Sequence, residues 1–385
     1  MSRVVIKESV LLWAVDRAGL TPDDLQHRFP KIQQWVTGES QPTLCELERL
    51  AKATWTPLGF FFLTEPPEDR LPIPYYRTLD GGPLSRPSPN LLETVQVMQR
   101  RQAWMREYLT DQGQEPLSFV RSARLDDSPA SLANRIRREL NLDKGWAAQK
   151  PTWTDALDTL HETIEGAGIL VIRNGIVGNN THRKLNPDEF RGFVLVDEYA
   201  PLVFVNGADS KAAQMFTLAH ELAHVFLGSS AAFDLREMRP ADDPTEQACT
   251  RVAAEFLVPE QEIRQVWPSV QDTPERFQEM ARQFKVSELV VARRVLDLAL
   301  IKKKAFLDFY DHYQNDVRRK ATLQSGGGDF FANQNFRVGR RFFSAVVRAV
   351  KEGELLYSEA YHLTGLYGKT FDSYATELKI RGTLQ

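Results

Sequence analysis

Residues 216–228, FTLAHELAHVFLG, place two histidines and a glutamate inside an otherwise apolar run. His220 and His224 are four residues apart, so on a helix their imidazoles share one face, about one turn apart. Two imidazoles in this arrangement can ligate one zinc ion, each at about 2 Å. Glu221 lies about 100° further round the helix, where it can act as a general base on water activated by the metal. Buried ionisable groups need strong partners, so the segment predicts a helix that carries a metal site.

A hydrolytic zinc site takes a third protein ligand and keeps one position open. The extended pattern HExxHxxGxxH is absent, which makes carboxylates of the next segment the better candidates. Glu246 shares a predicted helical face with Cys249 and Ala253, the apolar face that must pack inward. Glu255 lies roughly opposite and is expected to face solvent. Glu246 also lies three residues after Asp243, a spacing typical of a capping box, so two roles stay open. Of these we favour the third zinc ligand.

The two segments FTLAHELAHVFLG and EQACTRVAAEFLVP together resemble the ImmA/IrrE family of zinc metallopeptidases, over about residues 190–301. The resemblance implies a thermolysin-like minimal zincin domain with a small sheet. It also implies the roles of four residues: zinc ligation by His220, His224 and Glu246, and general-base catalysis by Glu221. Thr250 stands where the family usually has asparagine, and Val252 where phenylalanine is common.

The same resemblance implies a regulatory protease rather than a digestive one. We expect a zinc-dependent endopeptidase that cleaves a regulatory protein, either a transcriptional repressor or a neighbouring toxin-like protein, in a stress response or in mobile-element control. The alternative is a non-catalytic helix-turn-helix regulator or antitoxin-like binding protein with a structural metal. Glu221 favours the enzyme, because a purely structural site has no need of a base.

Three short β-branched runs bounded by turn residues predict strands: GILVIRNG (168–175), FRGFVLVDEY (190–199) and PLVFVNG (201–207). Helical spacing dominates elsewhere, so the predicted fold class is α+β and mostly helical. Residues 65–90 are rich in proline and predict a linker or strap. We expect four parts: a helix-turn-helix-like module (1–75), a proline-rich strap and helical region (76–165), a zincin-like metallopeptidase domain (166–301) and a C-terminal helical domain (302–385).

The N-terminal segments LTPDDLQHRF and WVTGESQPTLCELERLAKAT are similar to a Cro/repressor-type helix-turn-helix. Such modules place a recognition helix in the major groove of DNA. Residues 25–38 are shorter than the usual form and leave Lys31, Gln33 and Gln34 for base contacts. A degenerate module kept for packing or dimerisation is therefore favoured over DNA binding.

The net charge of −3 provides no general attraction to nucleic acid or to membranes. Two cysteines, Cys45 and Cys249, make a disulfide framework improbable and predict a cytoplasmic protein. The N-terminus has no secretory pattern, and no run of about 18 apolar residues predicts a membrane span.

Overall fold

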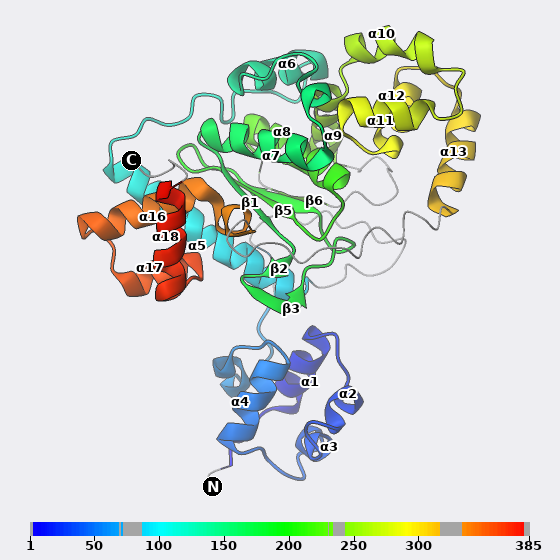
Figure 1. The fold of residues 1–385 in the computed structure, drawn as a ribbon. Helices are drawn as coiled ribbons and strands as arrows, with labels where there is room; N and C mark the ends of the chain where they lie inside the picture. The colour runs from blue at the N-terminus through cyan, green and yellow to red at the C-terminus, as the bar shows by residue number, and fades with distance from the viewer. Residues whose placement is uncertain are drawn as a thin grey trace. The chain divides into compact units, whose positions relative to one another are not determined.

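The computed structural model describes residues 3–68, 71, 87–229, 231–233, 243–315 and 333–380. These residues form a mostly helical α+β protein with a small mixed sheet, which confirms the predicted fold class (Figure 1). The chain divides into two compact units, one of residues 1–72 with 79–96, the other of 73–78 with 97–385. The predicted strap at 65–90 lies largely outside the described residues. Among the described residues, no helix combines the length and apolar character needed to cross a membrane.

The N-terminal unit consists of short helices around its own core. Its elements are α1 (Glu8–Arg17), α2 (Pro22–Gln26), α3 (Ile32–Val36), α4 (Leu44–Ala53) and the 3-10 helix η1 (Leu58–Phe62). Thr21 caps α2 and Thr43 caps α4, each in a capping box with an acidic residue three positions on, Asp24 and Glu46. Buried aromatic and aliphatic side chains join the helices: Leu11, Trp13, Leu25, Phe29, Ile32, Trp35, Leu47, Leu50 and Phe61.

The second unit is built on a four-stranded sheet. Its strands, in the order β1-β5-β4-β6, are β1 (Leu170–Asn174), β5 (Leu202–Asn206), β4 (Gly192–Leu195) and β6 (Ala231–Phe233). β1 pairs with β5 in parallel, whereas β4 pairs antiparallel with both β5 and β6. Every residue of β1, β4 and β5 is buried, because side chains cover both faces of the sheet. The three predicted strands are thus confirmed, and β6 is additional. A separate hairpin, β2 (Ile176–Val177) with β3 (Asn180–Lys184), was not predicted.

Helices cover the sheet with an apolar layer. Val203 and Val205 of β5 belong to the main core together with Leu218 and Leu222 of α8 (Lys211–Leu227). Figure 1 shows α7 (Trp153–Gly166) and α8 across one face of the sheet. α9 (Pro244–Leu257) packs against both α8 and α6 (Pro129–Glu139). The helix that carries the histidines is therefore enclosed by the sheet and by neighbouring helices.

The remaining helices complete the second unit. They are α5 (Pro89–Asp111, which begins in the first unit), η2 (Trp146–Gln149), α10 (Glu260–Val270), α11 (Arg276–Phe284), α12 (Glu288–Asp297), α13 (Lys303–Asn315), the π-helix η4 (Asn335–Gly339), α16 (Arg340–Glu352), α17 (Tyr357–Thr364) and α18 (Lys369–Ile380). Ser287 caps α12, and Phe306 of α13 lies in the main core. Arg101 of α5 donates hydrogen bonds to the carbonyl oxygens of Leu363 and Thr364 at the end of α17.

The prediction that Glu255 faces solvent is wrong. Its side chain forms an ion pair with Arg294 of α12 and accepts a hydrogen bond from the backbone N–H of Glu260, 3.2 Å away. Only 8% of the residue is exposed. The helical spacing identified one inward face of α9, but α6 and α12 cover the opposite face as well. Arg137 of α6 donates to the carbonyl oxygens of Glu255 and Phe256, which shows how closely these elements approach.

This burial predicts a stability role for Glu255. The substitution Glu255→Gln should lower the free energy of unfolding by about 1–3 kcal/mol, because Arg294 loses its charged partner in a buried place. Urea unfolding of the full chain measures the change. The same substitution at the exposed Glu279 is the matched control and should be neutral. Equal stability of the two variants would contradict this role.

Candidate metal centre

Helix α8 holds the two histidines in its last two turns. Ser210 caps its N-terminus by accepting a hydrogen bond from the N–H of Ala213 at 3.2 Å. Gly228 ends it in the left-handed conformation, with φ of 81°. Every residue from 214 to 226 is buried. The polar groups of His220, Glu221 and His224 are therefore fixed in a rigid, water-poor position.

Helix α9 brings a carboxylate to the histidines. Asp243 caps this helix by accepting hydrogen bonds from the N–H groups of Thr245 (2.7 Å) and Glu246 (3.2 Å). The Glu246 carboxylate itself contacts the imidazoles of His220 and His224. Asp243 is thus confirmed as the N-cap, and the side chain of Glu246 is directed to the neighbouring helix.

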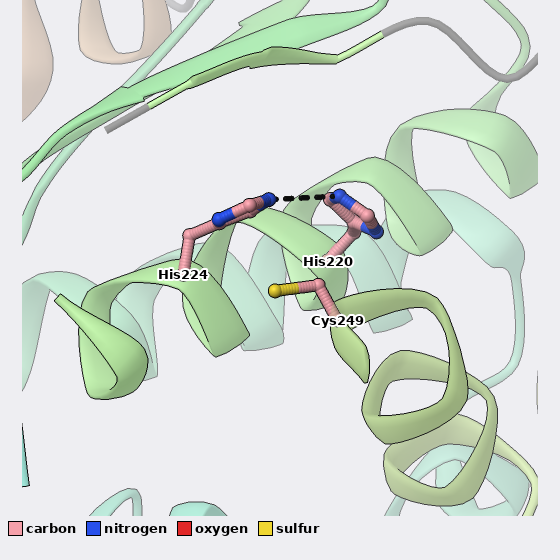
Figure 2. Close-up of side chains that lie close together, drawn as sticks. All are labelled: His220, His224 and Cys249. Atoms are coloured by element: carbon pink, nitrogen blue, oxygen red, sulfur yellow. Dashed lines mark hydrogen bonds between the residues drawn. The ribbon is translucent and has the colours of Figure 1, made fainter. Parts of the chain in front are cut away.

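Three donor groups, two imidazoles and one carboxylate, lie close to one another. His220 Nε2 lies 3.0 Å from Glu246 Oε2, and His224 Nε2 lies 3.2 Å from Glu246 Oε1. The two Nε2 atoms are 3.1 Å apart, and Figure 2 shows them facing each other. A tetrahedral zinc ion bound at about 2.0–2.1 Å to each donor separates the donors by about 3.3 Å. The donor set and its spacing therefore fit a zinc ion.

The protonation states of these groups also suit a cation. Burial lowers the pKa of His220 to about 4, so its imidazole is neutral at physiological pH. Burial opposes ionisation of Glu246, but the close contacts with the imidazoles of His220 and His224 outweigh it and bring the pKa of its carboxyl group to about 2. A neutral imidazole and an ionised carboxylate are the forms that bind metals.

Glu221 lies in a different environment from Glu246. Its residue is fully buried, and neither carboxylate oxygen has a hydrogen-bond partner among the described residues. Burial, and then the nearby charge of Glu246, raise the pKa of Glu221 well above its ordinary value. A Cβ atom on Gly192 of β4 would lie 3.3 Å from Glu221 Oε1 and 2.5 Å from Thr217 Cγ2. Only glycine allows β4 to approach α8 so closely.

Cys249 is a further possible metal ligand, although the sequence pattern indicated only apolar packing for it. Its thiol, fully buried, lies with donor nitrogens of His220 and His224 in a group whose atoms are within 4.8 Å of one another (Figure 2). Burial and the nearby carboxylates raise the pKa of the thiol. The signal was present in the sequence, because Cys249 follows Glu246 by three residues and shares its helical face.

Comparison with known proteins assigns a class to this part of the chain. Residues 164–296 match the peptidase family described as the IrrE N-terminal-like domain, and this stretch contains both donor helices. The chain therefore contains a segment similar to a metallopeptidase domain, which supports the family resemblance seen in the motifs. Residues 338–377 match a domain of unknown function that spans most of α16 to α18. No curated protein matches the chain.

The two readings of Glu246 lead to different metal contents. As a ligand, Glu246 is replaced poorly by glutamine, because a neutral amide binds zinc weakly, so Glu246→Gln should lose most of its zinc. If Glu246 instead belongs to a helix cap, glutamine can replace it in that role, and the variant should keep its zinc. Metal analysis of the purified full chain measures zinc per protein.

The exposed Glu279 again supplies the control for Glu246, through Glu279→Gln. Retention of zinc by both variants would exclude Glu246 as a required ligand.

Proposed function

We propose that this chain is a cytoplasmic zinc-dependent endopeptidase that cleaves a regulatory protein. The observation that carries the proposal is the buried Glu221 carboxylate, which has no described hydrogen-bond partner and adjoins a cluster of three metal-type donors. The peptidase family match over 164–296 supports the same reaction class. A purely structural metal site does not need an additional buried acid at this cost in desolvation.

Zinc, when bound, supplies a Lewis acid that lowers the pKa of a water molecule. His220, His224 and Glu246 would hold the ion; three protein donors is the number typical of catalytic zinc sites rather than of closed structural ones. Glu221 would accept a proton from that water and would donate it to the leaving amine. A cation on these donors would favour the ionised form of Glu221, the form that can act as a base, against the burial that raises its pKa.

The proposed substrate is a transcriptional repressor or a neighbouring toxin-like protein, cleaved in a stress response or in mobile-element control. This part rests on the resemblance to ImmA/IrrE proteins, with which the match over 164–296 agrees.

Glu221→Gln tests the catalytic proposal. Glutamine keeps the size and hydrogen-bonding capacity of the side chain but cannot accept the proton, so cleavage should slow by about 10²–10⁴ with zinc still bound. The experiment combines the full chain with candidate proteins encoded beside it, and measures both new peptide termini and zinc content. Glu279→Gln should cleave like the wild type. Equal cleavage by Glu221→Gln would refute Glu221 as the base.

A second candidate function rests on the position of Cys249. If its thiolate joins His220, His224 and Glu246, the site has four protein ligands and is closed, as structural zinc sites are. The chain would then be a non-catalytic helix-turn-helix regulator or an antitoxin-like binding protein with a structural metal. Cobalt substitution separates the two candidates, because a sulfur ligand adds a charge-transfer absorption band that Cys249→Ala removes.

For the N-terminal unit we propose a helix-turn-helix-like module that has lost most of its DNA-reading capacity. Helix α3 has five residues and is about 7.5 Å long, which is short for a recognition helix. Gln33 donates a hydrogen bond to Asp23 at 2.8 Å, and Gln34 accepts one from Ser40 at 3.3 Å. Both amides are therefore engaged within the unit itself.

Titration of the full chain with its own promoter DNA tests this assignment. We expect weak binding without sequence preference at physiological salt, typical of non-specific dissociation constants of about 10⁻⁴–10⁻⁶ M. A scrambled DNA of equal length is the control. Nanomolar binding to the promoter alone would contradict the prediction.

A further inference from the structure

The outer nitrogen of each histidine contacts a hydroxyl group. Nδ1 of His224 lies 2.8 Å from Oγ of Ser229, a normal hydrogen-bond distance. Nδ1 of His220 lies 3.5 Å from Oγ1 of Thr250, at the long limit of such a contact. The hydroxyls come from different elements, the end of α8 and the middle of α9. Of the two, the contact of Ser229 is the stronger.

The end of α8 fixes the position of Ser229. The N–H groups of Gly228 and Ser229 both donate to the carbonyl oxygen of His224, at 2.8 and 3.3 Å. Gly228 has φ of 81°, and a Cβ atom there would come within 2.3 Å of Cγ of Arg121. The backbone of Arg121 in turn donates to the carbonyl oxygen of Val225 at 3.1 Å. The backbone therefore holds Ser229 beside the last turn of the helix, next to His224.

We propose that Ser229 is a positioning residue, which holds His224 in the tautomer that presents an unprotonated Nε2 to the metal donors. A neutral imidazole carries one proton on either nitrogen. The Ser229 hydroxyl accepts a hydrogen bond from Nδ1–H, so the proton stays on Nδ1 and the lone pair of Nε2 points toward Glu246 and His220. The inference rests on the zinc site of the proposed function but not on peptidase activity.

A hydroxyl partner has a specific electrostatic consequence. Metal-bound histidines commonly donate to a carboxylate or a backbone carbonyl, and such partners raise the basicity of the ligand. The neutral Ser229 hydroxyl orients His224 without adding charge, so Glu246 is the single anionic member of the three-donor set. A dication on this set keeps more of its positive charge, which favours polarisation of water over tight structural binding.

Removal of the hydroxyl tests the proposal. Ser229→Ala should weaken zinc affinity by about 10–100-fold, the range found when partners of metal-binding histidines are removed. Competition between the full chain and a chromophoric chelator for zinc measures the affinity. Ser229→Thr keeps a hydroxyl and should restore affinity toward the wild type. Ser269→Ala is the matched control, because its hydroxyl bonds only the carbonyl oxygen of Val266 on an exposed part of α10.

A second measurement separates positioning from a loss of folding. Nitrogen NMR of the metal-free chain, labelled at histidine, should show His224 as the Nδ1–H tautomer in the wild type and as a mixture in Ser229→Ala. Unchanged affinity and tautomer in Ser229→Ala would overturn the proposal, as would an equal loss of affinity in Ser269→Ala. Wild-type protein that binds zinc and shows these effects, yet cleaves nothing, would refute the proposed function alone.

Discussion

The packing of α8 against α9 inside the main core is the constraint on which the site depends. It removes His220, His224, Glu221 and Glu246 almost completely from solvent. Burial of so many ionisable groups in one place is unfavourable unless they interact with one another or with a bound cation. The short distances among three of them provide part of this compensation. A divalent cation would provide the rest, including for Glu221.

Three buried arginines of the second unit are hydrogen-bonded within the protein. Arg101, Arg137 and Arg294 each donate to carbonyl oxygens near a helix end, at α17, α9 and the residue after α9. Such contacts satisfy groups that helices leave unpaired at their C-termini. Glu221 differs, because neither of its oxygens has a described hydrogen-bond partner. The contrast is between arginines that join helices and a carboxylate that joins none of the described elements by a hydrogen bond.

Much of the fold could be predicted because its signals are local. The acidic residue Asp243, three positions before Glu246, indicated the start of α9, and β-branched runs identified the three central strands. The hairpin β2–β3 was missed because its longer strand, NTHRK, is polar and gives no apolar alternation. The error at Glu255 has a tertiary cause, since α6 and Arg294 of α12 cover the side of α9 that helical spacing assigns to solvent.

The candidate metal donors also include some that local sequence signals predict and one whose position depends on tertiary packing. The pair His220 and His224 follows from helical spacing alone, whereas the distance from either to Glu246 depends on how two helices pack. Sequence reasoning could place Glu246 on an inward face but could not determine its 3.0 Å contact with His220. The contact of the Ser229 hydroxyl with His224 could not be predicted from the sequence either, because it depends on the left-handed turn at Gly228.

Helix α8 follows the central strand β5 directly in the chain, and this connection couples the site to the folding of the whole unit. β5 pairs on both sides, and only residues 207–210 separate it from the helix that carries both histidines. Regions with such dense burial open only in the global unfolding reaction. The amide protons of β5 and of the middle of α8 should therefore exchange with solvent at a common slow rate. Thermal unfolding would then be an all-or-none event, with no stage at which a folded protein has lost only the helix that carries both histidines.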